Sequence, residues 1–176
     1  MNDAAAKAEW VRATLERHED SLLRYAAFIT GDAERARDIV QETFVKLWGA
    51  EQEELDGHLT EWLFTVCRNR ALDVQRKEKR MTALTEMDLE TRESSEPSPS
   101  LAAEQNESSS QLLRLLETLP PNQREAVRLK FQCDLSYREI SRVTKLSVSN
   151  VGFLIHTGIK TLRQKFQNEA KENHSL

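Results

Sequence analysis

Side chains that suit DNA gather at the start of one predicted helix, which begins after Ser147. Serine hydroxyls bind phosphate oxygens, an asparagine amide pairs with the edge of adenine, and an aromatic ring contacts the methyl group of thymine. A lysine adds positive charge for the phosphate backbone. The residues expected to face away from the apolar stripe of this helix are Ser147, Ser149, Asn150, Phe153, His156 and Lys160. Their types and spacing favour nucleic-acid binding.

The surrounding pattern predicts a helix-turn-helix that would position these side chains. Ser136 and Glu139 form an S-x-x-E capping box at the start of a first short helix. A turn follows at 144–146, and Ser147 caps the second helix. The expected apolar positions are Tyr137, Ile140 and Val143 in the first helix and Val148, Val151, Ile155, Ile159 and Leu162 in the second. In this motif the second helix can enter a DNA major groove; the alternative is a helical hairpin in an ordinary all-α domain.

The composition predicts an all-α fold of two small helical domains. The 176 residues include only five glycines and four prolines, and 31% are charged. No apolar run approaches the length of a membrane span, and the N-terminus does not resemble a signal peptide, so we expect a cytoplasmic protein. Cys67 and Cys133 stand far apart and are expected on buried helix faces. We therefore expect no disulfide, no metal and no cofactor.

A flexible acidic linker is expected at 83–109, between domains at 9–82 and 110–168. The linker contains S-S-E-P-S-P-S and E-Q-N-E-S-S-S and has no apolar period, so it cannot bury enough surface to fold. Residues 86–107 hold seven acidic residues and one arginine. The net charge of −4 for the whole chain therefore originates in this segment.

Positive charge is concentrated in two other segments. Residues 68–80 contain six basic and two acidic residues, and residues 136–166 contain six basic residues and one acidic residue. Because phosphate attraction depends on local charge, the acidic total does not exclude DNA binding.

The N-terminal domain is expected to contain three main helices, at about 9–30, 33–48 and 59–80. Gly31 would end the first, and Asp32 would cap the second. In the C-terminal domain, four short helices are expected, of which the second would be capped by Asn122 and would place Phe131 in the core.

Three blocks of the chain carry a family resemblance. They are D-I-V-Q-E-T-F-V-K-L-W at 38–48, E-W-L-F-T-V-C-R-N-R-A-L-D-V-Q-R-K-E-K-R at 61–80, and L-P-P-N-Q-R-E-A-V-R-L-K-F at 119–131 followed by the helix-turn-helix. In this order they resemble the sigma-70 family of bacterial sigma factors. The absence of a third folded domain in the linker is similar to the short extracytoplasmic-function class.

The resemblance implies two roles for the N-terminal domain. The helix at 38–48 would bind core RNA polymerase through its β′ subunit, the contact residues being Asp38, Gln41, Glu42 and Trp48. An acidic and amide rim around apolar anchors suits a basic partner helix, while a solvated helix face is the alternative. The basic helix would bind and help melt the −10 element through Arg68, Asn69, Arg76, Lys77, Lys79 and Arg80. We expect Phe44, Leu47 and Trp62 in the core, and Asp73 to orient a neighbouring cation.

The C-terminal domain would read the −35 element by the same resemblance, and the β subunit of core polymerase is a further expected partner of the chain. The chain departs from the common pattern on its recognition helix, where Gly152, Leu154, Thr157 and Ile159 stand at positions that are often basic. Fewer cations predict a weaker hold on phosphate and a shallower salt dependence. Either −35 recognition relies more on shape and apolar contact, or this face also meets a protein.

Several alternatives remain open at this point. A stand-alone helix-turn-helix regulator would bind duplex DNA but would leave the basic N-terminal helix without a role. A nucleic-acid hydrolase is disfavoured because the chain lacks a nucleophile-base-acid set and metal-ligand spacing, so we expect no enzyme. The acidic linker is either an RNA mimic in the polymerase exit path or a plain spacer. An anti-sigma factor is an expected partner of this class.

Overall fold

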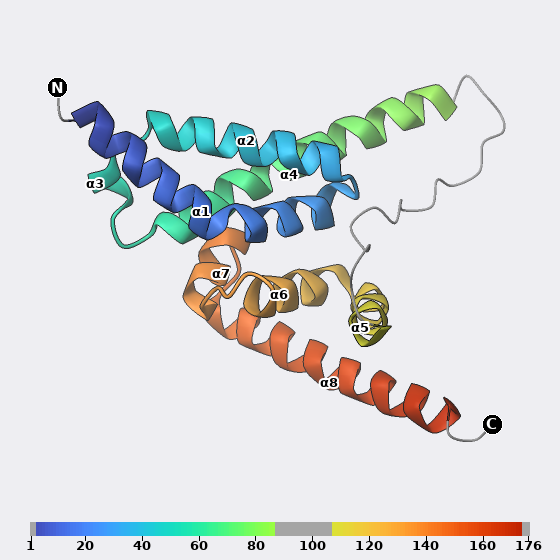
Figure 1. Cartoon of the computed structure of the whole chain (residues 1–176). Helices are drawn as coiled ribbons and strands as arrows, with labels where there is room; N and C mark the ends of the chain where they lie inside the picture. The colour runs from blue at the N-terminus through green and yellow to red at the C-terminus, as the bar shows by residue number, and fades with distance from the viewer. Residues whose placement is uncertain (1–2, 87–106, 174–176) are drawn as a thin grey trace. The chain divides into compact units, whose positions relative to one another are not determined.

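The computed structural model describes residues 3–86 and 107–173, with side chains described at 4–83 and 111–169. These residues form eight helices and no strand, which confirms the predicted all-α class. The helices are α1 (Asp3–Thr30), α2 (Ala33–Gly49), α3 (Gln52–Leu55), α4 (Leu59–Glu86), α5 (Glu107–Glu117), α6 (Pro121–Phe131), α7 (Tyr137–Thr144) and α8 (Val148–Asn173) (Figure 1). They divide into two compact units, α1 to α4 and α5 to α8. Most of the predicted acidic linker lies outside the described residues.

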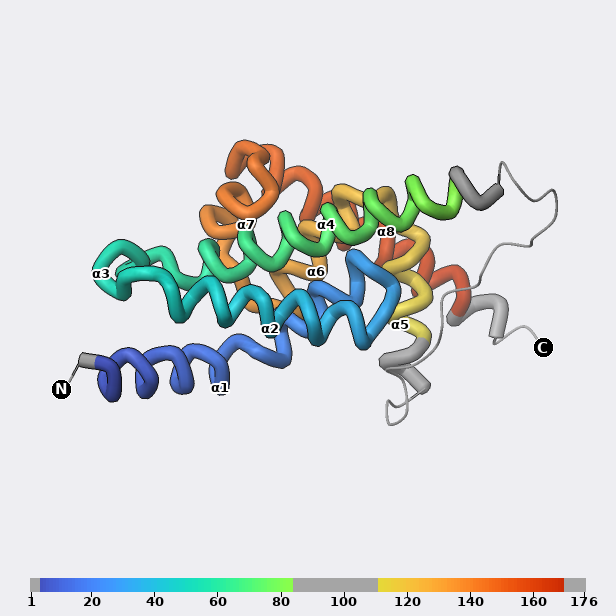
Figure 2. The backbone as a smooth tube through the Cα atoms, turned by 90° about the horizontal axis from the view of Figure 1, so that it is seen from above, coloured from blue at the N-terminus to red at the C-terminus, as the bar shows by residue number. Residues whose placement is uncertain are grey.

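The first unit is built from three long helices that pack on one another. Helix α1 packs against both α2 and α4, and α2 and α4 run side by side (Figure 2). The apolar stripe of each helix faces the common core, where the fully buried large side chains are Leu22, Tyr25, Ile39, Leu47, Leu63 and Phe64. The rings of Tyr25 and Phe64 lie 5.6 Å apart between centroids and join α1 to α4.

The junction between α1 and α2 has the predicted form. Gly31 adopts a positive φ of 70°, which ends α1 without steric cost. The Asp32 carboxylate then accepts a hydrogen bond of 3.0 Å from the Arg35 backbone amide. The pKa of Asp32 is lowered chiefly by this bond. The predicted glycine stop and aspartate cap are confirmed.

The first unit also differs from the prediction in its helix limits. Helix α1 begins at Asp3 and α4 continues to Glu86, six residues beyond each predicted limit. The one-turn helix α3 was not predicted; it buries Leu55 in a run that is otherwise polar. A four-residue helix is too short for its apolar period to be recognised in a sequence.

The second unit packs α6, α7 and α8 together, with α5 against α8. The fully buried large residues of its core are Leu119, Leu129, Leu135, Ile140, Val143 and Val151. Leu116 and Val127 close one end of this core, where Leu113 and Leu162 pack against them. The prediction of four short helices is wrong for α8, which has 26 residues.

Several predicted core and cap positions in the second unit are wrong. Helix α6 begins at Pro121, and no side chain caps it, whereas Asn122 was expected as the cap. Proline suits the first helical position because it has no amide proton to satisfy there. Phe131, at the last residue of α6, is 61% exposed instead of buried. Cys67 is buried as predicted, but Cys133 is half-buried and follows the end of α6.

The apolar faces of α7 and α8 are narrower than the sequence pattern indicated. Tyr137 and Val148 are exposed, and each is the first residue of its helix. The buried face of α8 starts one turn later and continues through Val151, Ile155 and Gly158. Gly158 is buried because α8 crosses α6 there. A Cβ atom added at Gly158 would lie 2.9 Å from Cγ2 of Val127, so glycine permits this close approach.

No helix among the described residues combines the length and the apolar character that crossing a membrane requires.

Candidate nucleic-acid interface

Hydrogen bonds at both helix starts define the helix-turn-helix. The Ser136 amide donates to Glu139 Oε2 at 2.7 Å, and the Glu139 amide donates to Ser136 Oγ at 3.3 Å, which confirms the predicted capping box. Lys145 ends α7 in the left-handed region, with φ of 60°. Ser147 Oγ then accepts from the Asn150 amide at 3.2 Å, which confirms the predicted cap of α8. These local bonds set where α8 begins.

The outer face of α8 is exposed opposite its buried face. The predicted contact residues Ser147, Ser149, Asn150, Phe153, His156 and Lys160 are all exposed. The Phe153 side chain is 65% exposed, which is unusual for a large aromatic residue. Val151 and Ile155, between these positions, are buried. The helix therefore presents hydroxyl, amide, aromatic and cationic groups on one accessible face, as the spacing predicted; their contact with DNA stays a prediction.

The second half of α4 presents the predicted basic face. Asn69, Arg76, Lys77, Lys79 and Arg80 are exposed, and Arg68 is half-buried. Asp73 pairs with Arg76 one turn away at 3.2 Å, in the manner expected of helical neighbours. Trp62 is half-buried beside the fully buried Leu63. Exposed cations on a rigid helix fit a phosphate backbone, and an exposed asparagine can read a base edge.

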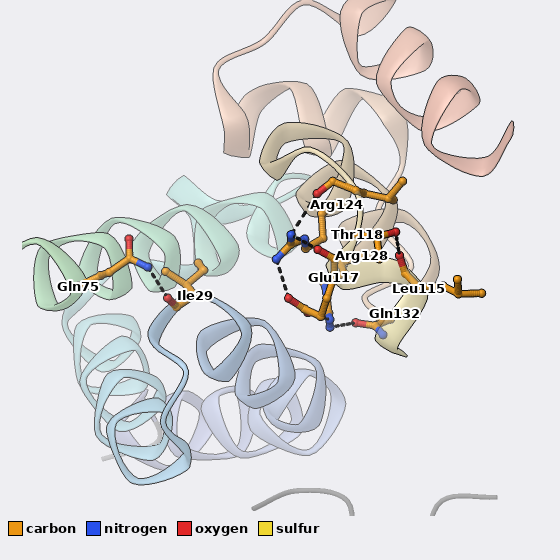
Figure 3. A network of polar contacts seen from close by, with 9 residues as sticks. Ile29, Gln75, Leu115, Glu117, Thr118, Arg124, Arg128 and Gln132 are labelled. Atoms are coloured by element: carbon orange, nitrogen blue, oxygen red, sulfur yellow. Dashed lines mark hydrogen bonds and ion pairs between the residues drawn. The ribbon is translucent and has the colours of Figure 1, made fainter. Parts of the chain in front are cut away.

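Cross-helix contacts hold this basic half of α4 in place. The Gln75 amide donates to the backbone oxygen of Ile29 at 2.8 Å, near the end of α1 (Figure 3). Glu78 forms an ion pair with Arg35 of α2. The sequence did not reveal either contact, because the partners lie more than 40 residues apart.

The outer face of α2 carries the residues predicted to bind a partner. Asp38, Gln41, Glu42 and Trp48 are exposed, whereas Phe44 and Leu47 are buried in the core as predicted.

An apolar residue that the sequence reasoning missed lies on the same face of α2. Val45 is 70% exposed and stands four residues after Gln41 and three before Trp48, which is 50% exposed. That spacing was the signal available in the sequence. Exposed Val45 and Trp48 beside Asp38 and Gln41 give an apolar centre with a polar edge, which is the usual anatomy of a protein interface.

Glu42 makes a contact that the sequence did not indicate. Its Oε2 accepts from Arg70 Nε at 2.5 Å, and its Oε1 accepts from Arg70 Nη2 at 2.9 Å. The hydrogen bond from Arg70 is the main reason that the pKa of Glu42 is lowered, and the same bond raises the pKa of Arg70. This pair links α2 to α4.

Two arginines of α6 bind the end of α5 in the second unit. Arg124 donates to Glu117 Oε2 at 2.6 Å and to the backbone oxygens of Glu117 and Leu119 (Figure 3). Arg128 donates to Glu117 Oε1 at 2.9 Å and to Gln132 Oε1 at 3.0 Å, and its burial lowers its pKa. Cations at the carboxyl end of a helix satisfy its free carbonyl groups. The cluster therefore fastens α5 to α6 and has no evident chemistry of its own.

No metal site is evident among the side chains that the structure describes, since no three His, Cys, Asp or Glu residues are grouped there.

Comparison with known proteins matches both halves of the chain. Residues 14–81 match the model described as "Sigma-70 region 2", and residues 109–162 match that described as "Sigma-70, region 4". The chain is 31% identical over 170 residues to the "ECF RNA polymerase sigma factor SigL" of Mycobacterium tuberculosis, covering 93% of each. It is also 31% identical over 175 residues to the "ECF RNA polymerase sigma factor SigE" of Mycolicibacterium smegmatis, covering 97% of this chain and 66% of that protein.

A solved structure shares the fold. The sigma factor RpoE, in complex with the anti-sigma factor NepR from Bartonella quintana, superposes with a TM-score of 0.65. The match covers 89% of this chain and 96% of RpoE, at 22% sequence identity.

Proposed function

This chain belongs to the sigma-70 family, in the extracytoplasmic-function class of RNA polymerase sigma factors, and we propose that it binds core polymerase and directs it to promoters with −10 and −35 elements. The observation that carries the proposal is the match to both sigma regions in one chain, which is supported by the exposure of predicted contact residues in each unit. The polymerase would supply all the chemistry of RNA synthesis, so we assign no catalytic residue to this protein. Its action on promoter DNA would take place in the bacterial cytoplasm.

The −35 element would be read by the outer face of α8. The Ser147 and Ser149 hydroxyls lie where the helix dipole also favours phosphate oxygens. Asn150, one turn into the helix, suits adenine, and the exposed ring of Phe153 suits a thymine methyl group. Lys160 would contact the backbone further along.

The −10 element would bind the second half of α4 and open there. Arg68, Arg76, Lys77, Lys79 and Arg80 supply positive charge to a separated strand, and Asn69 supplies an amide for a base edge.

Core polymerase would bind the outer face of α2. Asp38 and Gln41 would contact a basic surface, while Val45 and Trp48 would be buried at its centre. An anti-sigma factor is a further proposed partner, supported by the solved relative, which is named as a complex with one.

The test is to mix the purified protein with bacterial core polymerase and transcribe a promoter library. Stable association, followed by run-off transcripts from one defined pair of −10 and −35 elements, is the expected result. Sequence-specific binding to duplex DNA without any association with core polymerase would instead identify a stand-alone regulator.

Substitutions at Asn150 and Lys160 should separate base reading from phosphate binding. Asn150→Ala is expected to reduce discrimination at one −35 position by about 1–3 kcal/mol, because a bidentate amide contact is lost. Lys160→Ala should weaken binding to all promoters equally and reduce the slope of log affinity against log salt by about 1. Holoenzyme affinity for a set of −35 variants, measured at several salt concentrations, tests both. A uniform loss for Asn150→Ala would contradict its assignment to a base.

A further inference from the structure

Glu42 lies on the face of α2 that we assign to polymerase, yet its carboxylate is already occupied. Both oxygens accept hydrogen bonds from Arg70 of α4, at 2.5 and 2.9 Å, in the parallel two-bond geometry of an arginine-carboxylate pair. The side chains of Arg70 and Glu42 are 42% and 46% exposed, so the pair lies at the surface but is partly shielded from water. A carboxylate engaged in this way is a poor acceptor for a basic partner, unlike the exposed carboxylate of Asp38.

The partner of Glu42 stands in the part of α4 that we propose binds the promoter. Arg70 follows Arg68 and Asn69 directly, at the start of the basic half of α4. Two further contacts secure the same helix: Gln75 to the Ile29 backbone oxygen, and Glu78 to Arg35 of α2. The pairs at 70 and 78 tie α4 to α2 at two points about two turns apart.

Rigid attachment of these two helices has a functional consequence. One of them carries the proposed polymerase contact and the other the proposed −10 contact. A fixed orientation between them would set where the −10 strand lies relative to polymerase, and small errors in such positioning lower rates strongly.

We propose that Glu42 and Arg70 are positioning residues, whose pair holds the promoter-binding half of α4 in register with the polymerase-binding face of α2. This inference rests on the proposed function. Glu42 would then act on promoter opening through Arg70, and not by touching polymerase itself.

A double-mutant cycle separates positioning from direct contact. The variants are Glu42→Ala, Arg70→Ala and the double variant, with Glu19→Ala on the exposed face of α1 as a control. Affinity for core polymerase is measured without DNA by competition with labelled wild-type protein. The rate of promoter opening is measured at saturating protein.

Positioning predicts the same defect in all three variants. Each single change should lower the rate of promoter opening about three- to five-fold and leave affinity for core polymerase within about two-fold of wild type. The double variant should be no worse than either single variant, and the control should match wild type. Loss of core affinity for Glu42→Ala alone, with Arg70→Ala unchanged, would show direct contact by Glu42 and overturn the proposal. So would additive losses in the double variant.

A failure of the proposed function can be told apart from a failure of the positioning role. If wild-type protein does not bind core polymerase, the same cycle is read from unfolding of the first unit, followed by tryptophan fluorescence. Non-additive unfolding midpoints would uphold the tie between α2 and α4, and additive midpoints would refute it.

Discussion

Asp38→Arg is expected to weaken association with core RNA polymerase strongly while leaving the protein folded. The Asp38 side chain is exposed on α2, on the face shared with Gln41 and Trp48. Reversing its charge against a basic partner surface should cost about 2–4 kcal/mol, or roughly 30- to 1,000-fold in affinity. Titration of the fluorescently labelled protein with core polymerase measures the effect, and the yield of run-off transcripts should fall in parallel.

A matched control is available on the neighbouring helix. Asp20 of α1 is also exposed, so Asp20→Arg makes the same charge change away from the proposed interface. It should leave affinity within about two-fold of wild type, since surface charges alone contribute little. Equal losses for the two variants would indicate a nonspecific charge effect and remove the evidence for a contact on α2.

Gly158→Leu should unfold or strongly destabilise the second unit. The glycine lies where α8 crosses α6, and even a Cβ atom there would lie 2.9 Å from Val127 Cγ2 and 3.6 Å from Gln123 Cβ. A leucine must displace α6 or adopt a strained rotamer, and we expect a loss of about 3 kcal/mol in the free energy of unfolding. Chemical denaturation followed by far-ultraviolet circular dichroism measures it.

Gly152→Ala is a control for Gly158→Leu. Gly152 lies on the same helix, but a Cβ atom there would meet the Tyr137 ring at an ordinary 3.6 Å. Gly152→Ala should therefore stabilise α8 by up to about 1 kcal/mol through helix propensity.

All three tryptophans, at positions 10, 48 and 62, belong to the first unit. Their fluorescence transition should be unchanged in Gly158→Leu. A shifted tryptophan transition, or unchanged stability by circular dichroism, would contradict the role given to Gly158.

Features encoded by neighbouring residues were predictable from the sequence. The Ser136 and Glu139 capping box, the Ser147 cap and the Gly31-Asp32 junction are confirmed because each depends on bonds within three residues. Interior stretches of amphipathic helices were also predictable from their period. The burial of residues at helix ends was not predictable. Phe131, Tyr137 and Val148 are apolar but exposed, because each lies at a helix terminus, where packing against a neighbouring helix stops and the apolar period no longer decides burial.

The candidate interfaces were predictable to a similar extent. Exposure of the α8 contact residues followed from the apolar period, and the basic character of α4 could be read directly. Pairing between Glu42 and Arg70 could not be predicted, because 28 residues separate them and the sequence offers Arg70 several other carboxylates as partners. The bonds of Arg124 and Arg128 to Glu117 could not be predicted either, because they join two different helices, α6 and α5. Such contacts depend on how helices cross, which no local pattern contains.

Each compact unit uses one continuous stretch of the chain, and this has a consequence for folding during synthesis. The ribosome delivers α1, α2 and α4 before any of α5 to α8 exists, so the first core has all its side chains while the second is still unmade. Domains generally fold in that order as they emerge. The second unit then forms from its own continuous stretch, in which α8, the last helix to be made, packs against α5, α6 and α7. A growing chain therefore has only one incomplete core at a time, which limits the apolar surface available for aggregation.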